Sequence, residues 1–341
     1  MKLDKLKNWV GGIVEELTIP VSDSDGLSLS PLDGDAGFRR YYRLNTRPRL
    51  LAVYAPVATE DSRLFVNIAC YLRQNGVRVP AVLAHDFDQG FLLIEDFGET
   101  LYLDRLNGET VDELYSEALI SLLRLQQIPA DHSLFAKYDE TRLLDEMKLF
   151  RDWFITRCLG HTLRDSENAI LNKVFEVLVA SALEQPQVIV HRDFHSRNLI
   201  FNAGGAPGVI DFQDAVIGPV SYDLVSLLKD CYVYWDPPRI RHWALGYANM
   251  LADVGIISGV NETQFLQWFD WMGLQRHIKV LGIFCRLSIR DGKQRYLNDL
   301  PLVIRYTQNV IKHYPQFNEF SQWFDDSLSP LIRQQSWMQG R

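Results

Sequence analysis

The spacing of hydrophobic residues divides the chain into a β-rich part and a helical part. Residues 2–17 carry apolar side chains at helical spacing and are followed by Pro20, which predicts an amphipathic helix that ends before this proline. From about residue 27 to residue 97, short apolar runs alternate with glycine and proline, a pattern typical of strands and turns. In this part we predict two strands around a glycine turn in 27–44, a strand in 49–56, a helix in 61–76 and a hairpin around 88–90.

Helical spacing dominates after residue 98. The stretch "TVDELYSEALISLLRLQQI" predicts a long helix, and Thr110 with Glu113 three residues later has the spacing of a capping box. Further helices are expected over 139–158 and 166–184, and almost everywhere after 217–232. The pattern indicates an α+β fold with two lobes. We expect a β-rich lobe over 1–97, a larger, mainly helical lobe over 98–341, and a linker near Phe97–Gly98.

Composition restricts the class of protein. The chain has 341 residues, of which 47% are hydrophobic and 23% charged, as in ordinary globular proteins. A net charge of -8 argues against a general nucleic-acid binder. We find no apolar run near the roughly 18 residues that span a bilayer, and the N-terminus lacks the apolar core of a signal peptide. Four cysteines lie far apart without metal-ligand spacing, so we expect free thiols and a cytoplasmic protein with no membrane partner.

The stretch "VHRDFHSRNLIF" places many polar groups between two short strand-like runs. Asp193 is followed five residues later by Asn198, and Asp211 comes thirteen residues further on, in "GVIDF". A carboxylate can receive a hydroxyl proton, and an amide oxygen with a second carboxylate suits Mg²⁺. This pattern predicts phosphoryl transfer. One such match arises by chance in about one chain per hundred, and the same residues could cap a turn, begin a strand or lie on the surface. The second acidic position and the glycine turn, both in the right order, favour a kinase.

The same stretches carry a resemblance to a known family. With "GDAGFRRYYRL" and "GVIDFQDAVIGPVSYDLVSLL", the chain resembles the aminoglycoside-phosphotransferase family of small-molecule kinases, relatives of protein kinases, over nearly its whole length. The resemblance implies a bilobal protein-kinase-like fold that uses ATP and Mg²⁺. It also implies that Asp193 is the catalytic base, that Asn198 and Asp211 bind magnesium, and that Asp223 braces the catalytic loop. An acid that faces a helix dipole explains Asp223 equally well and is compatible with that role.

The resemblance also implies a nucleotide site in the β-rich lobe. The turn that contains Gly34, Asp35 and Gly37 can bring backbone N–H groups close to phosphate. Backbone groups of Glu95, Asp96 and Phe97 in "LLIEDFG" are expected to meet the adenine as a hinge. A plain hairpin turn and an ordinary edge strand are the alternatives for these two segments.

The third predicted strand departs from the family pattern. It reads "LLAVYAP" and holds Tyr54 where the family usually carries a phosphate-binding lysine, and the next helix has no obvious glutamate partner. Positive charge is therefore expected from the second strand, where Arg39 and Arg43 share one face and Arg40 lies on the other. Arg43 is included in the predicted nucleotide site, although each of these arginines is equally compatible with a solvated surface position.

The acceptor is expected in the helical lobe. From Val225 to Arg341 we count 13 lysines and arginines against 10 acids, which favours a neutral or anionic acceptor over a polycation. The stretches "IDFQDAVIGPVSYDLVSLLKDCYV" and "FCRLSIRDGKQRYLNDLP" are similar to the amino-sugar kinases of the family. That similarity implies phosphorylation of N-acetylmuramate or N-acetylglucosamine at the anomeric hydroxyl. The candidate substrate residues are His195, Arg197, Tyr232 and Arg290.

Other functions remain open from the sequence. Aromatic residues such as Tyr232 are more often part of a core than of a sugar site. The acceptor could be another small hydroxyl compound of the aminoglycoside, choline or homoserine type. The absent lysine is also compatible with a nucleotide-binding pseudokinase. The sequence gives no reason to expect an obligate protein partner or a nucleic-acid partner.

Overall fold

The computed structural model describes residues 2–22, 26–32 and 37–338. The chain forms two compact units that exchange segments along the sequence. The first unit comprises Met1–Ile128 and Arg197–Asp214, and the second comprises Pro129–Ser196 and Ala215–Arg341. The predicted boundary near Phe97–Gly98 marks the end of the nucleotide-binding lobe, and it stays a prediction. The first compact unit itself continues to Ile128.

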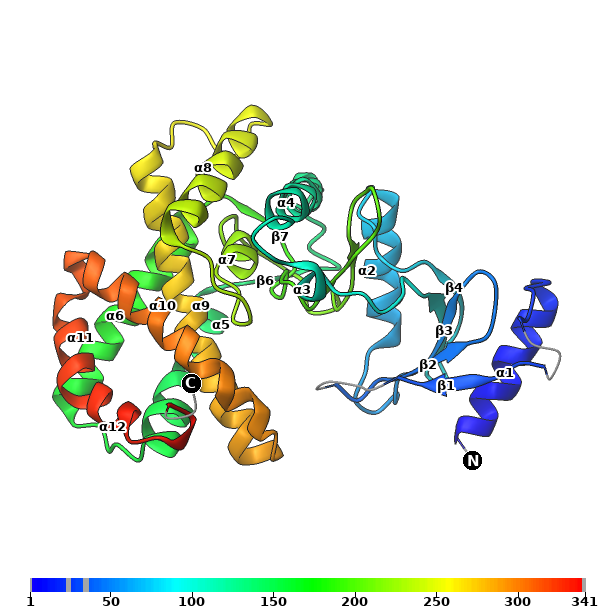
Figure 1. Cartoon of the computed structure of the whole chain (residues 1–341), viewed down its shortest axis with the longest axis horizontal. Coiled ribbons are helices and arrows are strands. Elements are labelled where there is room, and N and C mark those ends of the chain that lie inside the picture. The colour runs from blue at the N-terminus through cyan, green and yellow to red at the C-terminus, as the bar shows by residue number, and fades with distance from the viewer. Residues whose placement is uncertain (1, 23–25, 33–36, 339–341) are drawn as a thin grey trace. The chain divides into compact units, whose positions relative to one another are not determined.

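A five-stranded antiparallel sheet organises the first unit (Figure 1). The strands lie in the order β1-β2-β3-β5-β4. Their bounds are Leu29–Pro31 (β1), Arg40–Leu44 (β2), Leu50–Tyr54 (β3), Val82–Asp86 (β4) and Phe91–Glu95 (β5). All five correspond to predicted strands or hairpin arms, and Gly90, with φ of 70°, lies in the turn of the predicted hairpin.

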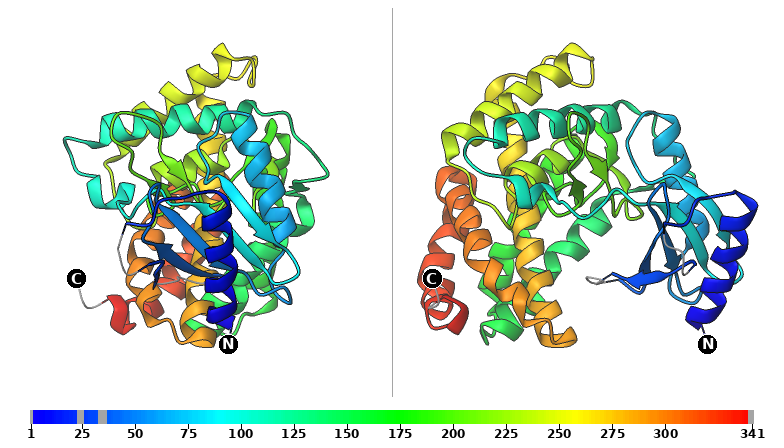
Figure 2. Two further views of the ribbon diagram at one scale, coloured as in Figure 1. Left: turned by 90° about the vertical axis from the view of Figure 1, so that its right-hand side faces the viewer. Right: turned by 45° about the vertical axis from the view of Figure 1, so that its right-hand side comes forward.

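Two helices cover opposite faces of this sheet, α1 (Lys2–Glu16) and α2 (Ser62–Gln74), as Figures 1 and 2 show. Leu50 and Ala52 of β3 lie in one core cluster with apolar residues of α1. Because side chains alternate across a strand, Leu51 and Val53 face the α2 side. Both helices were predicted, and the Asp61 carboxylate caps the N-terminus of α2 by accepting the Leu64 N–H at 2.9 Å.

The rest of the first unit contains α3 (Tyr102–Arg105), the predicted helix α4 (Val111–Gln127) and a short hairpin of β8 (Leu199–Ile200) and β9 (Gly208–Val209). The capping box at the start of α4 was predicted wrongly, because the Thr110 side chain makes no capping bond. Its hydroxyl instead donates to the Arg105 carbonyl at 2.6 Å and accepts the Asn107 N–H at 3.1 Å. The preceding turn therefore uses the hydroxyl that the helix needs.

The second unit is mainly helical, as predicted. Its α-helices are α5 (Glu140–Leu149), α6 (Asp165–Glu184), α7 (Tyr222–Leu228), α8 (Pro237–Asp253), α9 (Glu262–Asp291), α10 (Leu300–His313), α11 (Asn318–Trp323) and α12 (Ser329–Arg333). π-Helical turns span Phe150–Cys158 and Phe324–Leu328, and 3₁₀ turns span Gln294–Asp299, Pro315–Phe317 and Ser336–Met338. A small sheet joins β6 (Ala136–Lys137), β10 (Val216–Pro219) and β7 (Gln187–Val190) in that order.

Helix α9 is the central element of the second unit and packs against α5, α6, α7, α8 and α10. It begins at the side-chain cap Asn261 and ends at Gly292, whose φ of 70° suits a left-handed C-terminal cap. Within the ranges that the structure covers, no helix is long and apolar enough to cross a membrane. The four cysteines carry free thiols, as predicted.

Replacing Gly282 by Ala is expected to destabilise the second unit. A Cβ atom at Gly282 would lie 2.3 Å from the carbonyl carbon of Leu149, so α9 and the end of α5 pack with their backbones in contact. Overpacking against backbone costs about 1–3 kcal/mol. Urea unfolding followed by circular dichroism measures this loss. The control is Gly246→Ala in α8, where nothing lies within 4 Å of the added Cβ. That variant should gain up to about 1 kcal/mol, and equal stability of the two variants would contradict this packing.

Candidate active site

The turn after β7 is fixed from below by a buried carboxylate. Asp223 in the first turn of α7 is fully buried and accepts the backbone N–H groups of His191 at 2.6 Å and Arg192 at 2.9 Å. Burial raises the pKa of Asp223 to about 7, against the lowering effect of these two N–H groups and Arg276. Arg192 has a φ of 76°, a conformation that a residue without glycine's freedom adopts only when its surroundings impose it. The predicted bracing by Asp223 is therefore confirmed.

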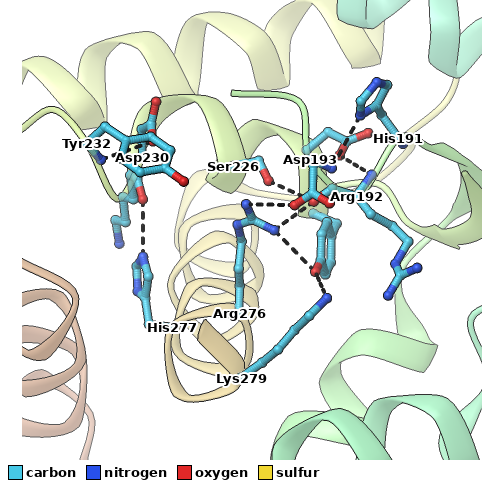
Figure 3. Close-up of polar contacts among 12 residues, drawn as sticks. His191, Arg192, Asp193, Ser226, Asp230, Tyr232, Arg276, His277 and Lys279 are labelled. Atoms are coloured by element: carbon cyan, nitrogen blue, oxygen red, sulfur yellow. Dashed lines mark hydrogen bonds and ion pairs between the residues drawn. The ribbon is translucent and has the colours of Figure 1, made fainter. Parts of the chain in front are cut away.

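This turn presents Asp193 to a buried cation from α9 (Figure 3). The Arg276 guanidinium donates from Nη1 to the Arg192 carbonyl at 2.6 Å, and its Nη2 lies 3.4 Å from Oδ1 of Asp193. The Asp193 side chain is 47% exposed, whereas that of Arg276 is 4% exposed. Partial burial raises the pKa of Asp193, but Arg276, His195 and Lys279 lower it further and leave it well below its ordinary value. Asp193 is thus a half-exposed hydrogen-bond acceptor that is ionised at neutral pH.

A second layer of charge anchors the turn to α5 and α9. The Glu146 carboxylate forms ion pairs with Arg192 and with Nζ of Lys279, the latter at 3.0 Å, and accepts the Tyr138 hydroxyl. Lys279 also donates to the Tyr222 hydroxyl at 3.0 Å. Burial raises the pKa of Glu146, and the two cations more than compensate, so this pKa ends below its ordinary value. Buried charges in such a network hold one geometry, because each lost partner leaves an uncompensated charge.

Two of the predicted substrate residues, His195 and Tyr232, lie close together in the second unit. The Asp230 carboxylate accepts the Ser196 hydroxyl at 2.5 Å and the Tyr232 N–H at 3.1 Å. This brings the Tyr232 ring to 5.5 Å from the ring of His195, at nearly a right angle. His195 is close enough to Asp193 to lower its pKa. The imidazole of His195 in the loop and the phenol of Tyr232 in the segment after α7 therefore lie together near the predicted base.

The other two predicted substrate residues are placed elsewhere. Arg290 lies in the last turn of α9 and is paired with Asp291 at 2.7 Å. It follows Arg276 by fourteen residues, which is about 21 Å along a helix axis. Arg197 opens the second segment of the first unit. The structure does not bring Arg290 to Asp193, and substrate roles for Arg290 and Arg197 stay predictions.

The predicted magnesium ligands occupy one end of the hairpin in the first unit. Leu199 pairs with Val209, and the Ile210 N–H donates to the Asn198 carbonyl at 3.1 Å, so Asn198 and Asp211 flank the same end of the ladder. Asp211 has a φ of 63°, and its Oδ1 accepts from Nε2 of Gln213 at 2.6 Å. An amide oxygen and an exposed carboxylate fit Mg²⁺, which takes one or two protein oxygens together with phosphate and water. No cluster of three His, Cys, Asp or Glu ligands occurs among the described residues.

The predicted hinge is tied to this hairpin. The Phe97 ring packs on Gly208, where an added Cβ would lie 2.3 Å from a ring atom. The guanidinium carbon of Arg78 lies 4.4 Å from the centre of the same ring. A side-chain oxygen of Glu95 accepts from Arg73 and from the Ala81 N–H, both at 3.2 Å. The close approach at Gly208 requires glycine and fixes the hinge segment beside the strand that leads to Asp211.

The remaining predicted nucleotide residues differ in what can be said of them. Gly34 and Asp35 lie outside the described residues, and the Gly37 carbonyl accepts from Nη1 of Arg40 at 3.2 Å. The Arg43 guanidinium pairs with the buried Asp96 carboxylate at 2.6 Å and also with Glu99. The charge of Arg43 is therefore already balanced by Asp96 of the hinge and by Glu99 just after it, and its contact with phosphate stays a prediction.

Sequence reasoning missed Glu146, Arg276 and Lys279. Arg276 and Lys279 are three residues apart in "WMGLQRHIKVLGIFC", so they share one face of an otherwise apolar, buried helix. Burying charged residues is unfavourable unless they are paired. Their spacing in an otherwise apolar helix was therefore the sequence feature that could have indicated buried ion pairs.

Replacing Arg276 by Met is expected to shift the pH profile. The Met side chain removes a positive charge that lowers the pKa of Asp193, so this pKa rises and the acidic limb of kcat/KM moves to higher pH. Arg276→Lys keeps a positive charge and should shift the limb less. The measurement is kcat/KM against pH for both variants, with circular dichroism to exclude misfolding. An unshifted acidic limb in the Met variant would mean that Arg276 does not act on Asp193.

Comparison with known proteins identifies the class. The model of the phosphotransferase enzyme family matches residues 28–255, about two thirds of the chain. The chain therefore belongs to this family, is a phosphotransferase, and by membership uses ATP. Arg276 and Lys279 lie beyond the matched segment.

Curated relatives extend the similarity to almost the whole chain. The N-acetylmuramate/N-acetylglucosamine kinase of Pseudomonas aeruginosa is 41% identical over 94% of this chain and 95% of its own length. The protein of the same name from Neisseria meningitidis is 37% identical over 92% of both chains. Predicted membership of a small-molecule kinase family is thus confirmed.

Solved structures confirm the predicted protein-kinase-like fold. The choline kinase of Cryptosporidium parvum matches with a TM-score of 0.63 at 13% identity, over 94% of this chain and 100% of that chain. The ADP-bound aminoglycoside phosphotransferase APH(2″)-Ib matches with a TM-score of 0.57 at 16% identity, over 88% of this chain and 97% of that chain. At these identities the likeness concerns the fold alone.

Proposed function

We propose that this chain is an ATP-dependent kinase that phosphorylates N-acetylmuramate, N-acetylglucosamine or both at the anomeric hydroxyl. The observation that carries the proposal is identity of 37–41% to relatives of that name over more than nine tenths of both chains. This similarity includes the helical C-terminal part, in which the acceptor site is expected. The mildly basic balance after Val225 agrees with a neutral or anionic sugar. We also propose a cytoplasmic location, because the reaction needs ATP and, as proposed, sugars from cell-wall recycling.

In the proposed reaction Asp193 accepts a hydrogen bond from the anomeric hydroxyl and then its proton. The sugar oxygen forms a bond to the γ-phosphorus, the bond from that phosphorus to the β–γ bridging oxygen breaks, and ADP leaves. Asp193 is a weak base because its pKa is low. A weak base suffices here, since phosphoryl transfer depends mainly on positioning and an anomeric hydroxyl is more acidic than an ordinary alcohol.

Asn198 and Asp211 are proposed to hold magnesium. When bound, Mg²⁺ neutralises charge on the nucleotide phosphates. The amide oxygen and the carboxylate would orient the ion from one end of the β8–β9 hairpin. His195 and Tyr232, which lie together beside Asp193, are proposed to contact the sugar.

A coupled ADP-release assay with a panel of acceptors tests the proposal. With ATP and Mg²⁺, turnover is expected on N-acetylmuramate or N-acetylglucosamine. The product should release phosphate in mild acid, because an anomeric phosphate is acid-labile and an ordinary phosphomonoester is not. Turnover only on choline, homoserine or an aminoglycoside would replace the sugar assignment by another small-molecule kinase. No turnover on any acceptor, with nucleotide still bound, would indicate a pseudokinase.

A further inference from the structure

The strand that usually carries the phosphate-binding lysine contains no cation in this protein. Strand β3 reads Leu-Leu-Ala-Val-Tyr over Leu50–Tyr54. The Tyr54 ring packs against Phe91 at 6.0 Å, on the face of the sheet covered by α1. By alternation, the opposite face of β3 presents only Leu51 and Val53 toward α2. A positive charge for the nucleotide phosphates must therefore come from another element.

Arg39, directly before β2, supplies a buried positive charge. Its side chain is 8% exposed, and its Nη2 lies 2.9 Å from Oε2 of Glu60, in the loop just before α2. The guanidinium carbon lies 4.9 Å from the centre of the Phe65 ring on α2. Protein kinases use an ion pair between the lysine of β3 and a glutamate of the helix that follows. Arg39 and Glu60 form a comparable pair, with the cation directly before β2 and the acid in the loop before α2.

The pair lies next to the segment of the predicted metal ligand. The Phe65 ring under Arg39 stacks on the Phe212 ring at 5.0 Å and an interplanar angle of 27°. Phe212 directly follows Asp211 in the chain. The Tyr41 phenol interacts with both charges, since burial raises its pKa, Arg39 lowers it and Asp211 raises it. Arg39 and Asp211 thus lie near the same small group of rings within the first unit.

The guanidinium of Arg39 still has an unused donor. Its Nε is buried and has no hydrogen-bond partner among the residues that the structure describes. A buried donor without a partner is unfavourable, and a charged one is especially so. The guanidinium fork suits phosphate oxygens, which accept two parallel N–H bonds. Arg43 differs, because Asp96 and Glu99 already surround its charge.

We propose that Arg39, oriented by Glu60, binds the phosphates of the nucleotide in place of the missing lysine. This rests on the proposed function, in which a magnesium nucleotide binds beside Asp211. Glu60 acts as a positioning residue, because it touches Arg39 and not the phosphates. The pair also explains how the protein retains a phosphate-binding cation although β3 and α2 lack the lysine and the glutamate.

Calorimetric binding of ADP and of adenosine tests the proposal without any need for turnover. The variant Arg39→Met/Glu60→Gln removes both charges, so no buried carboxylate is left unpaired. We expect the Kd for ADP to rise about 10- to 100-fold, the worth of one charge-assisted phosphate contact. The Kd for adenosine should change less than about twofold. The control is Arg63→Met, which removes an exposed arginine of α2 that lies over Phe87 and should leave both constants unchanged.

Each other outcome overturns the proposal in a distinguishable way. Unchanged ADP binding in the double variant would exclude Arg39 while leaving the kinase assignment intact. Equal loss of ADP and adenosine binding would show a general effect on the unit instead of a phosphate contact. A wild-type protein that binds no ADP at all would remove the proposed function together with this inference.

Discussion

The Asp193→Asn variant is expected to lose at least about 10²–10⁴-fold in kcat, the range for removal of a general base. The amide keeps the size of the side chain but cannot accept the hydroxyl proton, and it removes the anion that Arg276 faces at 3.4 Å. Nucleotide binding should be nearly unchanged, because Asp193 is proposed to act on the acceptor. Asp193→Ala should give the same division between turnover and binding.

Steady-state kinetics gives the loss in kcat, and calorimetry gives the Kd of ADP, so the two effects are measured separately. The control is Asp253→Asn, which replaces an exposed acid at the end of α8 and should leave both quantities unchanged. An Asp193→Asn variant that retains most of its kcat would exclude Asp193 as the base. A variant that loses ADP binding to the same extent as turnover would place Asp193 in the nucleotide site instead.

The Asp211→Asn variant is expected to lose both turnover and the magnesium dependence of nucleotide binding. Replacing one of two proposed protein ligands by a neutral amide weakens the hold on a divalent cation, which contributes several kcal/mol to charge stabilisation. We expect kcat/KM to fall at least about 100-fold. The left-handed backbone at Asp211, with φ of 63°, is easily adopted by asparagine, so folding should be retained.

Titration of ADP with and without Mg²⁺ separates this effect from general damage. In the wild type Mg²⁺ should tighten ADP binding, and in Asp211→Asn this tightening should be lost while binding of metal-free ADP persists. The control is Asp88→Asn, which changes an exposed acid in the turn between β4 and β5. A magnesium effect of wild-type size in Asp211→Asn would mean that other residues hold the ion.

Much of the fold could be predicted because local patterns determine it. The apolar runs of β3 and β5, the glycine in the turn between β4 and β5, and the long apolar faces of α4 and α9 all act over a few residues. Strands β6 and β10 were missed. They have two and four residues, and they exist because Val216 pairs with Ala136 and with Val190, far apart in the sequence. Pairing of this kind leaves no periodic signal in so short a segment.

The candidate site also contains residues that could be predicted from the sequence and residues that could not. Asp193, Asn198 and Asp211 stand in a recognisable spacing, and the role of Asp223 was implied by the family resemblance. The ion pair of Glu146 with Lys279 depends on how α5 packs on α9, and that of Arg39 with Glu60 depends on how the loop before α2 packs beside the residue before β2. Sequence spacing determines neither. Arg43 illustrates the limit. Its position on the strand suited phosphate, but its partners are Asp96 of the hinge and Glu99 just after it.

The most direct test of the account is the position of the transferred phosphate on the sugar. N-Acetylglucosamine or N-acetylmuramate labelled with carbon-13 at C1 is incubated with the enzyme, ATP and Mg²⁺, and the product is examined by carbon NMR. The account predicts that the C1 signal becomes split by coupling to phosphorus with the wild type and stays unsplit with Asp193→Asn. A phosphorylated sugar whose C1 signal stays unsplit with the wild type, or equal splitting with Asp193→Asn, would contradict it.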